Sequence, residues 1–206
     1  MGFSSLIDIL GATVIGGILL MILLRMNDKA VENTYLHGAE LMVQENLVAV
    51  VELLEHDFRK IGYCKRWNVL PDPSHAIIAA DSNSIAFLTD LNNDGNIDTL
   101  HYYTGSTSEL SNTANPRDRL LYRVENSQPA RGSNLGVTQF RLTYFDALGN
   151  ELSFPITVPS AIYIMQIDVT VEDFESYNQN YSSAFWRQIR LRSEEHTSEL
   201  QSPYVI

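Results

Sequence analysis

The sequence feature that most constrains this chain is an uncharged apolar run close to its N-terminus. Residues 9–24 carry no charge, and Asp8 is the only charged residue between Phe3 and Leu24. An α-helix rises about 1.5 Å per residue, so the 3–24 segment spans roughly 33 Å, enough to cross the hydrocarbon core of a bilayer. It lacks the basic start and the small-residue cleavage site of a secretory signal. We therefore expect residues 1–25 to form a retained transmembrane helix.

The residues after the apolar run keep a helical pattern. Between Asn27 and Ile61, apolar residues recur at spacings of three, four and seven, with charged and polar residues between them. No proline occurs before Pro71, so the sequence offers no strong helix breaker ahead of about Ile61. We expect residues 26–62 to be an amphipathic continuation of the same helix, and the part from Leu47 onward to pack under a sheet.

After Gly62 the pattern changes to short segments rich in β-branched and aromatic residues, separated by Gly, Pro, Asn and Asp. Several segments alternate between apolar and polar residues, which is typical of a sheet with one face on a core. Strands are expected at 75–80, 84–89, 97–104, 120–125, 137–145, 151–154, 161–171 and 184–191. The predicted fold class is α+β: a long N-terminal helix, transmembrane and then amphipathic, packed on an antiparallel β-sheet head at residues 63–191.

Composition narrows the function. The chain carries 25 Asp and Glu against 14 Lys and Arg, a net charge of -11, which repels phosphate backbones and argues against a nucleic-acid partner. The single cysteine, Cys64, excludes an intramolecular disulfide and a multi-thiolate metal site. No nucleophile elbow, phosphate-binding glycine loop or metal-spaced histidine pair occurs. The sequence therefore predicts a protein that is not an enzyme and requires no cofactor.

One loop has the spacing of a calcium site. Oxygen-bearing side chains occupy its positions one, three, five and nine, with a glycine at six, as in an EF-hand. The candidate ligands are Asp90, Asn92, Asp94, Asn96 and Asp98. Position twelve is His101 instead of a bidentate Glu, and strand-like segments flank the loop. Two interpretations stay open, a weak calcium site and a plain hairpin turn around Asp94-Gly95.

Several short motifs resemble the type IV pilin family. Gly2-Phe3 and the acidic apolar segment at 6–10 are similar to that family's processing site and first helical turns. The stretch 55–63, EHDFRKIGY, resembles the D-x-R-x-x-G-Y stretch of minor pilins and of the J-type minor pseudopilin of type II secretion. Further similar segments are 87–95 leading to Tyr102-Tyr103, 121–123, and 137–140 leading to 144–146. Together they cover about residues 3–191.

The resemblance implies a role for the N-terminus. A prepilin peptidase would cut between Gly2 and Phe3, and Asp8 would pair with the amine of Phe3 of a neighbouring subunit during assembly. Two features depart from the family pattern: Asp8 is the sixth residue counted from Phe3 where the family has its acidic residue at the fifth, and the basic residues Arg25 and Lys29 follow the apolar run. The latter placement opposes an exported head under the positive-inside rule.

The resemblance also implies a function and a location. The chain would be a non-catalytic structural subunit, a minor and initiating or tip subunit, of a type IV pilus or a type II secretion pseudopilus. It would be methylated on Phe3 and associate with other pilin-like subunits through its helix. It would lie in the inner membrane with an extracytoplasmic head, or in an assembled filament. The alternative is a signal-anchored extracytoplasmic module that binds a ligand and contains a calcium-stabilised loop.

The last fifteen residues are expected to lie outside the natural protein. Residues 192–202, RSEEHTSELQS, resemble the in-frame translation of a common sequencing adapter. We therefore treat 192–206 as an artefactual tail and exclude it from the fold. The acidic balance of the chain does not depend on this segment.

Overall fold

The computed structural model describes residues 2–66, 68–70, 72–174 and 181–191. The chain divides into two compact units, Met1–Leu41 and Met42–Ile206, and each is described by itself. The first unit is helical and belongs to α1 (Gly2–Phe58). Its large apolar side chains from Leu6 to Leu24 are exposed. As the uncharged run predicts, α1 is long and apolar enough to cross a membrane.

The last turns of α1 form one wall of the hydrophobic core in the second unit. Val50, Leu54 and Phe58 recur four residues apart, so they share one face of the helix, and all three are buried. The Phe58 ring packs edge-on against Phe87 and against Tyr102, with centroids 5.4 Å apart in both pairs. The expectation that the helix from Leu47 onward packs under the strands is confirmed.

The end of α1 differs slightly from the prediction. The helix ends at Phe58 instead of Ile61, and Gly62 adopts φ +79°, a left-handed conformation that favours glycine. A Cβ there would also lie 3.2 Å from the Pro73 Cβ. The Gly62 N–H donates to the Leu88 carbonyl at 3.0 Å, which ties the chain after the helix to a strand of the sheet.

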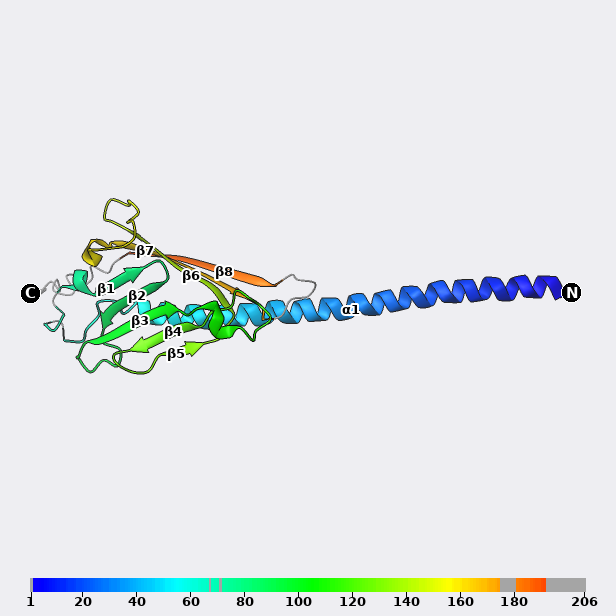
Figure 1. Cartoon of the computed structure of the whole chain (residues 1–206), viewed down its shortest axis with the longest axis horizontal. Coiled ribbons are helices and arrows are strands. Elements are labelled where there is room, and N and C mark those ends of the chain that lie inside the picture. The colour runs from blue at the N-terminus through cyan, green and yellow to red at the C-terminus, as the bar shows by residue number, and fades with distance from the viewer. Residues whose placement is uncertain (1, 67, 71, 175–180, 192–206) are drawn as a thin grey trace, which may run out of the picture. The chain divides into compact units, whose positions relative to one another are not determined.

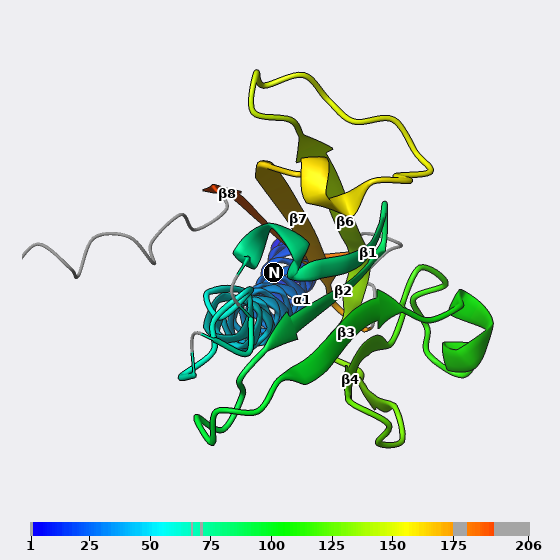
Figure 2. The same cartoon turned by 90° about the vertical axis from the view of Figure 1, so that its left-hand side faces the viewer.

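The described strands form two antiparallel sheets (Figure 1). Sheet order is β1-β2-β3-β4-β5 in the first, with bounds Ile77–Asp81, Ser84–Thr89, Asp98–Thr104, Leu121–Glu125 and Arg131–Ser133. The second is β6-β7-β8, with bounds Val137–Phe145, Ile164–Glu172 and Ser183–Leu191. Short 3-10 helices lie at Pro73–His75, Thr107–Leu110 and Pro159–Ala161. Figure 2 shows the C-terminal turns of α1 beside strands of both sheets, and side chains from all three build one core.

The strand predictions hold with two differences. Residues 151–154 form no strand; Glu151 makes only an isolated bridge to Phe145, and Phe154 is exposed. The segment has too little buried apolar surface to hold a place in either sheet. Conversely, β5 was not predicted, because Arg131-Gly132-Ser133 has no apolar residue and all three are exposed. The head also holds two sheets where the sequence indicated one.

Alternation in β7 follows the prediction. Met165, Ile167, Val169 and Val171 are buried, as expected for one face of a sheet on a core. Asp168, on the opposite face, is also buried, and Arg187 of β8 pairs with it at 2.5 Å. Together the long apolar helix and the antiparallel strands confirm the predicted α+β, pilin-like architecture.

Candidate functional sites

The N-terminal candidates lie in the first unit. Gly2 and Phe3 stand in the first turn of α1, with their side chains outside the described part of the chain. Asp8 is exposed, and so are the flanking Ile7 and Ile9. A carboxylate on an exposed apolar helix is suited to pairing with a group from another molecule, because a membrane supplies no water to solvate it. The predicted roles in processing and assembly stay predictions.

Four of the candidate calcium ligands, Asp90, Asn92, Asp94 and Asn96, lie in the hairpin loop between β2 and β3. The fifth, Asp98, begins β3 and is the register partner of Thr89. The carboxylate of Asp90, the first residue of the loop, accepts hydrogen bonds from backbone N–H groups. Asp90 Oδ2 accepts from the N–H of Gly95 at 2.9 Å and of Lys65 at 3.1 Å, and Oδ1 accepts from the N–H of Asp94 at 3.1 Å. The segment therefore forms a hairpin that joins β2 and β3.

Internal hydrogen bonds also engage the remaining side chains of the loop. Asp94 Oδ1 accepts from the N–H of Asn96 at 2.7 Å, and Oδ2 accepts from Asn92 Nδ2 at 3.1 Å. These bonds hold the pKa of Asp94 below its usual value. Asp98 accepts from the N–H of Leu91 at 3.2 Å and from Asn126 Nδ2 at 2.8 Å. Each of these oxygens already has the donor that a turn requires.

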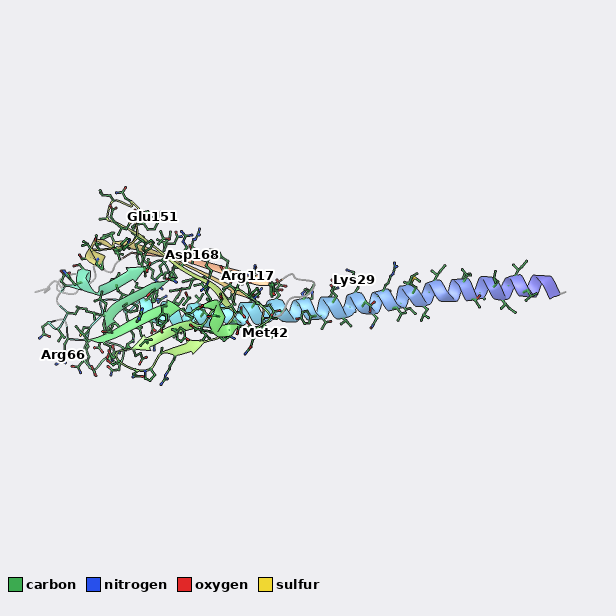
Figure 3. All side chains as sticks on the ribbon, viewed as in Figure 1. Lys29, Met42, Arg66, Arg117, Glu151 and Asp168 are labelled. Carbon is green, nitrogen blue, oxygen red and sulfur yellow. The ribbon has the colours of Figure 1, made fainter. Side chains whose placement is uncertain are left out.

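An arginine that the sequence did not single out lies across the loop. Arg66 Nε donates to the Gly95 carbonyl at 2.7 Å and Nη2 donates to Asn96 Oδ1 at 2.5 Å. Gly95 has φ +84°, a conformation in which any other residue would be strained, and a Cβ there would lie 2.5 Å from Arg66 Nε, so that Arg66 would have to move. In Figure 3, Arg66 lies at the end of the second unit far from Met42. A fixed cation beside these oxygens disfavours a second cation.

Within the described residues, no group of three or more His, Cys, Asp or Glu side chains is placed to hold a metal ion. Calcium at the 90–98 loop therefore stays a prediction. The geometry described above favours the turn.

A buried ionic centre joins three of the segments that carry the pilin resemblance. Asp57 of α1, Tyr102 of β3 and Arg123 of β4 are brought together, with Asp57 only 1% exposed. The Tyr102 hydroxyl donates to Asp57 Oδ2 at 2.5 Å, and Arg123 Nε donates to the same oxygen at 2.5 Å. His56 Nδ1 lies 2.9 Å from Asp57 Oδ1, and Arg123 also binds Glu125.

Electrostatics explain why Asp57 is charged in this position. Burial alone would raise its pKa, but hydrogen bonds from Arg123, Tyr102 and His56 outweigh burial and hold the pKa below its usual value. The same burial and the Asp57 charge raise the pKa of Tyr102, so its hydroxyl keeps its proton and donates it. The arrangement fastens the helix to the five-stranded sheet and leaves no group poised for acid–base chemistry.

A second buried carboxylate has the opposite environment. Asp118 is 1% exposed, and neither of its carboxylate oxygens has a hydrogen-bond partner within the described residues. Burial raises its pKa, and the nearby charges of Glu172 and Asp173 raise it further, while Thr113 and the charge of Arg117 lower it without cancelling the rise. Sequence reasoning missed this site, because nothing in the local pattern of residues 113–118 indicates burial.

The surroundings of the cysteine and of three of the histidines favour a structural role over a role as reactive groups or metal ligands. Cys64 is buried and packs with Leu70 and Ala76 in a small second cluster, as expected for a packed small hydrophobe. The His37 and His56 side chains are largely exposed on α1. His101 lies beside Tyr103 on β3, with ring centroids 4.8 Å apart. None of these histidines stands in a described metal group.

Comparison with protein-family models, with curated proteins and with solved structures finds no match for this chain.

Proposed function

We propose that the chain is a non-catalytic structural subunit of a pilin-like filament, a minor subunit of a type IV pilus or of a type II secretion pseudopilus. Its helix would associate with other pilin-like subunits after cleavage by a prepilin peptidase. The head would lie outside the cytoplasm. The observation that carries the proposal is one helix, α1, that is exposed and apolar from Leu6 to Leu24 and supplies a wall of the head core at its other end.

The exposed apolar surface needs a covering. Contiguous apolar surface in water is unfavourable and marks contact with lipid or with another protein. Both contacts suit a subunit that is first held in a membrane by its apolar helix and then enters a filament, where neighbouring helices replace the lipid around that helix. Asp8 gives this surface a specific feature, since a carboxylate costs about 2.5–3.5 kcal/mol at the centre of a bilayer and is stabilised by pairing with an amine.

Processing at Gly2-Phe3 is the first test. The gene product would be expressed beside an active prepilin peptidase and examined by intact mass and N-terminal sequencing. A mature chain that begins at Phe3, with or without a methyl group on its amine, is the expected result. An uncut N-terminus in the presence of active peptidase contradicts the proposal. Cleavage is required of a filament subunit, whereas a plain membrane anchor does not need it.

Asp8 provides the second test. Asp8→Ala is expected to reduce incorporation of the subunit into filaments at least tenfold, measured by quantitative immunoblotting of sheared filaments, while membrane insertion is unchanged. Asp28→Ala is the matched control, since Asp28 lies on the same helix beyond the apolar run. Equal incorporation of both variants into filaments would show that Asp8 has no role in assembly.

A second candidate function is a signal-anchored binding module whose helix serves only as a stalk. The feature that favours it is a cleft in the second unit that contains a buried arginine nitrogen, Arg190 Nη2, with no hydrogen-bond partner among the described residues. Absence of cleavage together with ligand binding by the head would support this function over the filament subunit.

A further inference from the structure

A cleft of about 310 Å³ opens where the chain leaving α1 approaches β1, β7 and β8. All the elements that form it belong to the second unit. Its apolar walls include Ile61, Ile77, Ile162 and Met165, and its polar groups include Arg59 and Arg190. Ile77, Ile162 and Met165 are buried members of the core, so this part of the cleft is firmly supported.

Arg190 carries a charge that the protein does not fully pair. Its Nε donates to Gln188 Oε1 at 2.7 Å, but Nη2 is buried without a hydrogen-bond partner in the described residues. Burial lowers the pKa of Arg190, and the charge of Arg59 lowers it further. An unpaired buried donor of a charged group is costly, so an acceptor at this point would be strongly favoured.

The nearest acidic residue is already engaged. Glu55 Oε2 accepts from Arg59 Nη2 at 3.2 Å, and Glu55 Oε1 accepts from Gln188 Nε2 at 3.2 Å. Glu55 raises the pKa of Arg190 without bonding to it. Two arginines against one glutamate leave a local excess of one positive charge, in a chain whose net charge is -11. The complementary ligand is therefore an anion.

The shape of the cleft restricts the kind of anion. Apolar walls beside two guanidinium groups fit a carboxylate carried on an aliphatic body better than a compact, multiply charged phosphate. Three consecutive residues of β8, 188–190, line the cleft. Successive side chains of a strand point to opposite faces of the sheet. A cleft that is lined by all three residues must therefore reach the edge of β8, where both faces are accessible. Within the described residues β8 is an outer strand, to which an extended peptide can be added.

We infer that the cleft binds an extended peptide segment of a partner protein that places an Asp or Glu carboxylate between Arg190 and Arg59 and a neighbouring aliphatic side chain against Ile162 and Met165. The carboxylate would accept from Arg190 Nη2. The segment's backbone would lie along the edge of β8. This site is separate from the apolar surface of α1 and does not depend on filament assembly.

The test uses the full chain in phosphatidylcholine nanodiscs and two fluorescein-labelled peptides. One peptide alternates leucine and glutamate, and the other has glutamine in place of each glutamate. Fluorescence anisotropy, corrected with empty nanodiscs, is expected to show at least tenfold tighter binding of the glutamate peptide. The overall charge of the chain acts against this preference, so it reports a local positive site.

Variants locate the site. Arg190→Gln and Arg59→Gln are each expected to reduce the preference to less than threefold; Arg59 is exposed, so its variant tests the site even where Arg190→Gln fails to fold. Arg131→Gln on β5 is the matched control and should retain the full preference. Equal binding of the two peptides, or a preference that survives both cleft variants, overturns the proposal. Displacement of the peptide by sodium octanoate at equal concentration overturns the peptide as the occupant.

Discussion

At the scale of the residue, Asp57 and Asp118 are both almost fully buried, yet their surroundings shift their pKa values in opposite directions. The difference lies in the donors. Arg123, Tyr102 and His56 supply Asp57 with hydrogen bonds, whereas the Asp118 carboxylate has no partner within the described residues. The cost of burying a charge is therefore compensated at Asp57, whereas at Asp118 the lowering of the pKa by Thr113 and Arg117 does not outweigh burial.

Asp118→Asn is expected to stabilise the second unit at neutral pH. The raised pKa in the folded state means that the wild-type protein loses stability as pH rises from about 3.8 through the folded pKa, because the buried carboxylate then becomes charged. Asparagine removes that charge. We expect a gain of about 1 kcal/mol at pH 7, seen as a higher melting temperature in near-ultraviolet circular dichroism. The gain should vanish near pH 3, and a lower melting temperature at pH 7 would contradict the argument.

Asp57→Asn is expected to have the opposite effect. The lowered folded pKa means that Asp57 contributes stability above about pH 3.8, and that this contribution is lost as pH falls through the folded pKa. Removing the charge leaves the Arg123 guanidinium without its buried partner, which costs about 3 kcal/mol at pH 7. Thermal unfolding at pH 7 and at pH 3 measures the difference, which should shrink at the lower pH. Glu52→Gln, exposed on the same helix, should be neutral.

At the scale of the element, the apolar pattern predicted most of the structure. The spacing of Val50, Leu54 and Phe58 and the alternation in β7 each depend on burial of one face, and both are confirmed. The uncharged run forms a helix as predicted, with its large apolar side chains exposed. Segments without that signal were predicted less well. β5 is polar and was missed, and the 151–154 segment alternates polar and apolar residues but is mostly exposed and forms no strand.

The sites were less predictable than the elements. The sequence placed Asp57, Tyr102 and Arg123 in three separate motifs, but 45 residues separate the first two, and only the packing of α1 on β3 and β4 brings them together. Arg66 matters because of its hydrogen bonds to residues about 30 positions away in the sequence. Arg190 and Asp118 stand out because buried side-chain atoms of each have no hydrogen-bond partner within the described residues. The spacing of residues along the sequence does not reveal which distant residues meet in the fold, or which buried groups lack a partner.

The β2–β3 loop is expected to fold without calcium. A cation bound with a dissociation constant of about 1 mM would add about 1.4 kcal/mol of stability at 10 mM calcium. We expect no such increase, since the loop's carboxylates already accept N–H donors and Arg66 places a positive charge beside them. Differential scanning fluorimetry with calcium, and with magnesium as the ionic-strength control, measures this. A calcium-specific rise that disappears in Asp94→Asn would establish the site instead.

At the scale of the whole molecule, one helix serves two environments. Its first part presents apolar side chains outward, and its last turns bury theirs in the core of the second unit. The division of the chain at Leu41 and Met42, well before the end of α1, reflects this change. The last turns of the helix thus belong physically with the strands, although they are continuous in secondary structure with the apolar segment.

Two truncations test this division. A chain lacking residues 1–41 is expected to unfold cooperatively, because it retains Val50, Leu54 and Phe58. A chain lacking residues 1–58 loses all three. Burial of each such side chain contributes about 1.5–3 kcal/mol, so the total approaches the whole stability of a typical domain, about 5–15 kcal/mol. Urea unfolding followed by near-ultraviolet circular dichroism should show a sharp transition for the first chain and no fixed tertiary signal for the second. A cooperative transition in the shorter chain would mean that the strands form a core without the helix.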